Sequence, residues 1–137
     1  MEHTEVVRLR RAVSKLARRL NGPATNANIP PAQASVLALV ATRGTIPRAD
    51  VAALEHVGDT VLDEAISALR EAGLLIEPAD PPAVLQVTPA GQAVEALIRA
   101  ERTDIVARAA AHLTDEDRAH LDAAVAALER LATAATG

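Results

Sequence analysis

One stretch, residues 46–91, most constrains the fold, because two helical patterns are followed there by two strand patterns. Within this stretch, one helix is predicted over residues 47–55, with a proline at its first position, and another over residues 59–72. Residues 74–77 and 84–87 have the composition of short strands around a proline-rich tip. This order of helix, turn, helix, strand, wing and strand is typical of a winged helix-turn-helix.

The side chains available for a core support a mainly helical fold. Although 50% of the residues are hydrophobic, Phe, Tyr, Trp and Cys are all absent. A core of Leu, Val, Ile and Ala suits close-packed helices better than stacked sheets. We therefore expect a mainly α fold with a small two-stranded β-wing. The missing side chains exclude aromatic base stacking, thiolate metal ligands and cysteine redox sensing.

Three regions are expected along the chain. Residues 1–30 hold an N-terminal helix and loop, residues 31–88 the winged helix-turn-helix domain, and residues 89–137 the C-terminal helices. Thr88 and Thr114 each precede a helical pattern as N-cap residues. One chain cannot easily cover the apolar stripes of all these helices and pack a winged domain as well. The two terminal regions are therefore expected to be dimerisation helices of a symmetric homodimer.

The apolar stripes of the terminal helices define the expected dimer interface. In the first helix, predicted over residues 3–20, apolar residues repeat with the spacing of a coiled-coil seam. The C-terminal helices carry longer stripes of Val, Ile and Leu. The expected interface residues are Leu9, Val13, Leu16, Leu20, Ile105, Leu121, Val125, Leu128 and Leu131.

Charge is distributed unevenly along the chain. Residues 1–21 carry a net +4, residues 43–87 a net −5 and residues 88–137 a net −3. Since phosphate neutralisation supplies most non-specific DNA affinity, three arginines against eight acids in the winged region are unfavourable for DNA binding. Two interpretations of the basic first helix stay open: pairing with acids of the later helices across the dimer, or a strip that follows the phosphates.

Four segments together resemble the MarR family of bacterial winged helix-turn-helix transcriptional regulators, and the resemblance covers nearly the whole chain. The TPAG sequence after the second wing strand is the most specific part. The segments are PPAQASVLALVATRG, IPRADVAALEHVGDTVLDEAISALREAGLL, VTPAGQAV and LTDEDRAHLDAAVAALERLA. The resemblance implies a DNA-binding homodimer with winged domains about one DNA turn apart. It also implies a cleft in which a small-molecule ligand relieves repression.

Two departures mark this chain as an atypical member with an acidic recognition helix and a shortened wing. Gly58 and Glu64 stand where the family usually has Ser or Thr and a DNA-facing Arg. The wing keeps only Asp80 of the family's Asp-x-Arg tip, followed by two prolines. The arginines with which the family usually reads the bases and the minor groove are therefore missing.

The candidate DNA-binding residues follow from helix position. A carboxylate can accept a hydrogen bond from cytosine N4, so even acids could read a base. The residues expected in the groove are Thr60, Asp63, Glu64 and Ser67, and those expected on phosphate are Arg43, Arg48 and Arg70. The alternative is a degenerate family member that does not bind DNA and acts as a protein-interaction or ligand-binding dimer. Its acidic face would then meet a basic partner.

Other classes of function are not indicated. The sequence has no phosphate-binding loop and no nucleophile with a paired base, so no enzyme is expected. The histidines are scattered, and a zinc site shared between two chains through His112 and His120 is disfavoured against ordinary surface histidines. No cofactor or metal is expected. No signal peptide or membrane span is indicated, so we expect a cytoplasmic protein.

Overall fold

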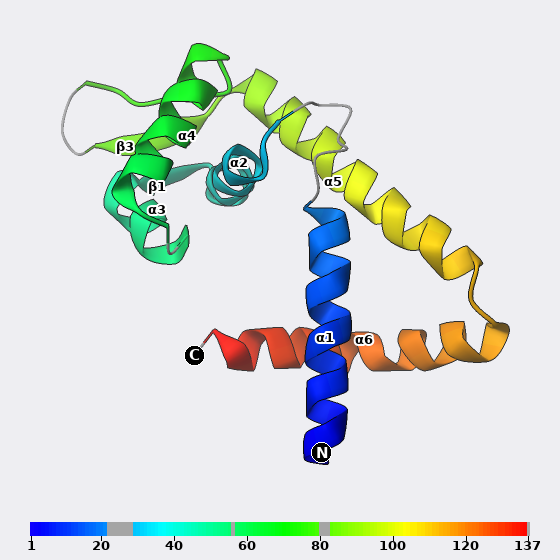
Figure 1. Ribbon diagram of the computed structural model, residues 1–137. Helices are drawn as coiled ribbons and strands as arrows, with labels where there is room; N and C mark the ends of the chain where they lie inside the picture. The colour runs from blue at the N-terminus through cyan, green and yellow to red at the C-terminus, as the bar shows by residue number, and fades with distance from the viewer. Residues whose placement is uncertain (22–28, 56, 80–82, 137) are drawn as a thin grey trace. The chain divides into compact units, whose positions relative to one another are not determined.

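The computed structural model describes residues 1–21, 29–55, 57–79 and 83–136 (Figure 1). Two compact units make up the chain, Met1–Arg102 and Thr103–Gly137. The elements are α1 (His3–Leu20), α2 (Pro31–Arg43), β1 (Thr45–Pro47), α3 (Arg48–Glu55), α4 (Asp59–Glu71), β2 (Leu75–Ile76), β3 (Val84–Val87), α5 (Pro89–Ala111) and α6 (Asp115–Ala135).

The core of the first unit lies where α2, α3 and α4 meet the sheet. Helix α2 packs against α4, α3, β1 and β3, and α4 also contacts β2. Because no ring side chains are available, branched aliphatic residues from every one of these elements interlock to fill the space. The largest fully buried side chains are Leu37, Ile46, Ile66, Leu69, Leu75, Leu85, Val36, Val40 and Val51.

The sheet has three antiparallel strands in the order β1-β3-β2. The expected mainly α winged fold is confirmed, but β1 is an additional strand that the sequence did not indicate. In it Ile46 is buried and lies opposite Leu85 of β3. Pro47, predicted to open the next helix, instead ends this strand, and α3 begins at Arg48. Proline is tolerated there because β1 is an edge strand with one neighbour.

The TPAG segment, residues 88–91, connects the start of α5 to the turn after α4 through hydrogen bonds. The Thr88 hydroxyl donates to the carbonyl of Gly73 at 2.6 Å and accepts from the backbone N–H of Gly91 at 3.0 Å, which confirms Thr88 as a cap. Gly91 itself lies so close to Leu74 that an added Cβ would be 2.1 Å from the Leu74 carbonyl oxygen. Only glycine fits at this crossing.

The terminal helices α1 and α6 have no buried side chain among their described residues. Thr114 caps α6, since its hydroxyl accepts from the Asp117 N–H at 3.1 Å, as predicted. The apolar stripe of α6 is exposed, with Leu121 at 47% and Leu128 at 39% of their full accessible area. None of the described helices is long and apolar enough to cross a membrane.

Candidate nucleic-acid interface

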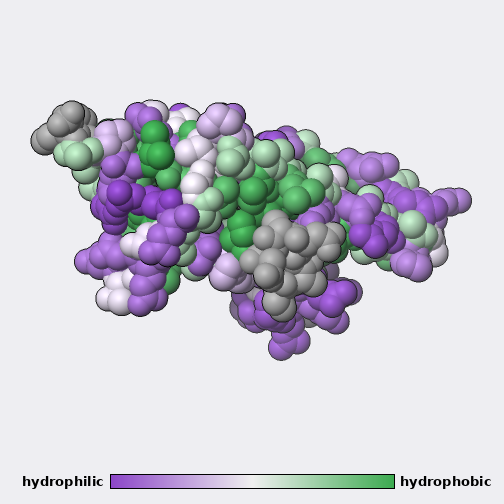
Figure 2. Space-filling view, turned by 90° about the horizontal axis from the view of Figure 1, so that it is seen from above, coloured by the Kyte–Doolittle hydropathy of each residue, from purple (hydrophilic) through white to green (hydrophobic). Residues whose placement is uncertain are grey.

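Helix α4 turns one face into the core and the opposite face outward. Its buried side chains, among them Leu62 and Ile66, follow helical spacing. The outward face carries all four of the predicted groove residues, and each of them is exposed: Thr60, Asp63, Glu64 and Ser67. On the left of the view in Figure 2, hydrophilic side chains cover most of the surface, interrupted by a narrower hydrophobic strip.

Arg48, at the first position of α3, is held by carboxylates of two other elements. Its Nε and Nη2 donate to the two oxygens of Glu77, each at 2.8 Å. Its Nη1 donates to Asp63 on α4, also at 2.8 Å. A two-bond fork between guanidinium and carboxylate is among the stronger charge-assisted contacts in proteins. Two residues that the sequence analysis assigned to DNA, Arg48 and Asp63, therefore bind each other.

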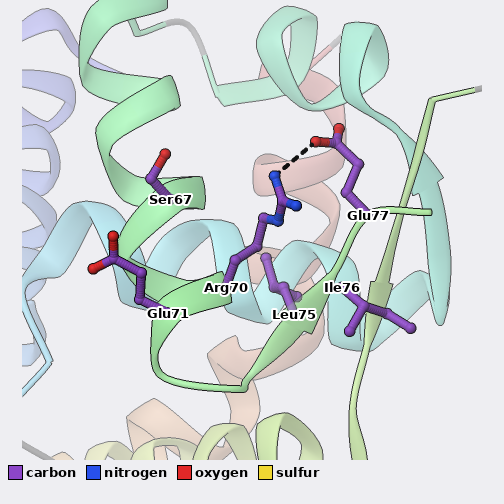
Figure 3. Close-up of a pocket in the computed structure, with 6 residues that line it drawn as sticks. All are labelled: Ser67, Arg70, Glu71, Leu75, Ile76 and Glu77. Carbon is purple, nitrogen blue, oxygen red and sulfur yellow. Dashed lines mark hydrogen bonds and ion pairs between the residues drawn. The ribbon is translucent and has the colours of Figure 1, made fainter. Parts of the chain in front are cut away.

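Glu77 is the centre of this ion cluster, which comprises Arg48, Asp63, Arg70 and Glu77. It follows β2 directly, and its side chain is only 14% exposed. Arg70 of α4 donates to Glu77 from Nη1 at 3.4 Å, and the two side chains face each other in Figure 3. The carboxylate thus joins the base of the wing to α3 and α4. Sequence inspection missed it, because Arg48 and Glu77 are 29 positions apart.

The titration behaviour of the cluster follows from these bonds. The hydrogen bonds from Arg48 lower the pKa of Glu77, and partial burial opposes them only in part. Its bonds to Glu77 raise the pKa of Arg48 in turn. Both groups are ionised at neutral pH, so the fork persists as an ion pair.

The lowered pKa makes the stability of the winged domain acid-sensitive. An ionised Glu77 stabilises the fold above the ordinary carboxyl pKa of 4.5, and this contribution is lost as the pH falls through the lowered value. We expect Glu77→Gln to cost about 1.5–3 kcal/mol at neutral pH, the range for hydrogen bonds to charged groups. The difference from the wild type should shrink well below the ordinary pKa. Urea unfolding of both proteins, at neutral pH and well below the ordinary carboxyl pKa, measures this difference in stability. A difference that does not change with pH would contradict an ionic contribution from Glu77.

Arg43 differs from the other two predicted phosphate contacts. It lies exposed at the end of α2, and it has no ion-pair partner within the described ranges. Arg48 and Arg70 are both paired with carboxylates. Of the three, Arg43 is the cation that can meet a phosphate without breaking an internal contact.

An open hollow of about 500 Å³ lies beside the ion cluster, between α4 and β2 (Figure 3). Arg70 and Glu77 line it from one side, while the Glu71 carboxylate points away from them. The remaining lining residues are Ser67, Leu75 and Ile76. In the part of the chain that the structure describes, no three His, Asp or Glu side chains are grouped so that they could hold a metal ion.

The arrangement of three helices, a three-stranded sheet and an outward second helix is that of a winged helix-turn-helix protein. No family model and no curated protein matches the sequence. Solved structures do match it over almost its whole length. A candidate transcriptional regulator protein from Pseudomonas aeruginosa PA01 is 29% identical, with a TM-score of 0.79 and 95% of each chain covered.

Two further structures carry the family name. A MarR family protein from Bacillus stearothermophilus is 17% identical, with a TM-score of 0.77 over 97% of this chain and 99% of the other. The oxidized form of MarR from E. coli is 18% identical, with a TM-score of 0.70 over 93% of this chain and 95% of the other. The chain therefore has the fold of the MarR-family transcriptional regulators, as the sequence resemblance predicted.

Proposed function

We propose that this protein is a MarR-like transcriptional regulator of the cytoplasm that binds double-stranded DNA as a homodimer. The observation that carries the proposal is α4, which stands at the recognition-helix position of a winged scaffold with its polar face fully outward. Helices in this position enter the major groove in helix-turn-helix proteins. No catalytic activity is part of the proposal.

The roles of the contact residues follow from their chemistry. The hydroxyls of Thr60 and Ser67 can donate to or accept from base edges, and the carboxylates of Asp63 and Glu64 can only accept, as from cytosine N4. Arg43 approaches phosphate directly. Arg48 and Arg70 reach phosphate only after leaving Glu77.

Dimerisation would bury the exposed stripes of the terminal helices. Pairing would remove the half-exposed leucines of these helices from water, and buried apolar area contributes about 25 cal/mol per Å². The proposed interface comprises Leu9, Val13, Leu16, Leu20, Ile105, Leu121, Val125, Leu128 and Leu131. A small-molecule effector completes the proposal, as the family resemblance implies.

A second function is favoured by the charge of the winged domain. Residues 43–87 carry a net −5, and two of their three arginines are neutralised within the fold. A surface of this kind repels a polyanion and attracts a basic partner. The second candidate is accordingly a protein-interaction or ligand-binding dimer that does not bind DNA.

A DNA titration separates the two functions. The purified protein is titrated against its own upstream DNA at low and at physiological salt, and the regulator is expected to bind with an affinity that falls as salt rises. Arg43→Gln should flatten the salt slope by about 0.9, the value for one phosphate contact. Arg108→Gln, which removes the same charge from an arginine already paired with Asp104, is the matched control. Absence of wild-type binding at low salt favours the second function.

A further inference from the structure

The ion cluster leaves the winged domain with few cations for a polyanion. Glu77 holds Arg48 by two bonds and Arg70 by one, and Asp63 takes a third nitrogen of Arg48. We propose that Glu77 sets the strength of DNA binding by withholding Arg48 and Arg70 from the phosphate backbone. The inference rests on the proposed function, in which duplex DNA supplies the competing anion.

Glu77 and a phosphate compete for the same fork of Arg48. Phosphate recognition by arginine uses the same two-bond fork that Glu77 now occupies through Nε and Nη2. The third nitrogen, Nη1, is bound to Asp63. A phosphate that uses the Nε and Nη2 fork therefore has to displace a carboxylate that already occupies it.

Arg70 is held less firmly than Arg48. Its single bond to Glu77 is 3.4 Å long, and its side chain is 47% exposed, whereas that of Arg48 is 32% exposed. It also borders the open hollow shown in Figure 3, where a phosphate oxygen has room to approach. Arg70 is thus the first cation that loss of the Glu77 charge would release.

The net charge of the cluster determines how much the DNA affinity should change when Glu77 is neutralised. Arg48 and Arg70 balance Asp63 and Glu77, so the cluster is neutral as it stands. Neutralising Glu77 leaves one net positive charge at a surface between α3, α4 and the wing. Each phosphate contact so gained steepens the dependence of log affinity on log salt by about 0.9.

The test compares two variants that remove the same charge. Glu77→Gln releases the arginines, while Glu71→Gln neutralises a carboxylate of the same hollow that, among the described residues, forms no hydrogen bond or ion pair with either arginine. Fluorescence anisotropy follows binding to an unrelated duplex and to the protein's own upstream DNA over a salt series. We expect Glu77→Gln to bind both duplexes more tightly than Glu71→Gln, with a steeper slope. The ratio of the DNA affinities of Glu77→Gln and Glu71→Gln should fall about threefold for each additional phosphate contact when the salt concentration rises fourfold.

Two further variants keep the test decisive. The double variant with Arg70→Gln and Glu77→Gln should lose part of the steeper salt dependence that Glu77→Gln alone shows. If circular dichroism shows that Glu77→Gln does not fold, Asp63→Asn replaces it on the unrelated duplex alone, where the proposed base contact of Asp63 plays no part, because Asp63 is 65% exposed and its loss frees only Nη1 of Arg48. A smaller gain over Glu71→Gln is then expected, and no gain overturns the inference.

The outcomes for the two proposals are separable. Equal binding by Glu77→Gln and Glu71→Gln overturns the role of Glu77, whatever the wild type does. If the wild type ignores its upstream DNA while Glu77→Gln binds both duplexes, the inference stands and the proposed function fails. If the wild type binds upstream DNA and Glu77→Gln adds slope, both stand.

Discussion

Replacing Gly91 with alanine is expected to destabilise the winged domain by about 3 kcal/mol, the upper part of the range for overpacking a tight contact. The added Cβ would lie 2.1 Å from the Leu74 carbonyl oxygen and 2.9 Å from Cγ2 of Val87. Neither the Leu74 backbone oxygen nor the partly buried Val87 side chain can yield without moving α5 away from the turn after α4. That movement would also break the bonds of Thr88 to Gly73 and Gly91. Urea or thermal unfolding at equal protein concentration measures the loss.

Gly58→Ala provides the matched control. Gly58 has a φ of −63°, and an added Cβ meets nothing within 4 Å. Its replacement changes only the N-cap preference of α4, at a cost of about 1 kcal/mol or less. If Gly91→Ala unfolds at the same urea concentration as Gly58→Ala, the close approach of α5 to Leu74 does not exist in solution.

The double substitution Leu121→Glu and Leu128→Glu is expected to convert the proposed dimer to monomers. A leucine that becomes fully buried contributes about 1.5–3 kcal/mol, and a carboxylate in its place is costly to bury unpaired. Two such changes should raise the dissociation constant by at least about 100-fold. Sedimentation equilibrium over a range of concentrations measures the molar mass.

The control for this prediction is Ala123→Glu, which adds an acid to the opposite face of α6. Helical spacing places Ala123 about half a turn away from the stripe of Leu121, Val125 and Leu128. This variant should keep the mass of the wild type. A wild-type protein that sediments as a monomer at high concentration, or a double variant that stays dimeric, refutes the proposed interface.

The fold and the charge of the winged domain point in opposite directions. Its scaffold is that of the MarR-family transcriptional regulators, whereas its net charge is that of a surface that repels polyanions. The ion cluster reconciles the two observations, since it holds both paired arginines close to the recognition helix. In the role that we propose for Glu77, competition between its carboxylate and phosphate for Arg48 and Arg70 sets the affinity for DNA.

Local sequence patterns were enough to predict much of the fold. The bounds of α1 and β3, the caps at Thr88 and Thr114 and the outward face of α4 all agree with the structure. Each depends on neighbours within one or two turns of chain, such as helical periodicity, strand alternation or a capping hydroxyl. The resemblance to the MarR family rests on segments of this kind and is confirmed by the fold.

Contacts between distant residues could be decided only by the tertiary structure. A three-residue strand such as β1 is too short for any pattern, and Pro47 favours a helix start until β3 is seen to pair with it. Arg48, which follows β1, and Glu77, which follows β2, meet only because β3 pairs with both strands. Sequence alone determined which groups carry charge and which faces of the helices are apolar. Folding decided which charges neutralise one another, because ion pairing depends on distance in space and not along the chain.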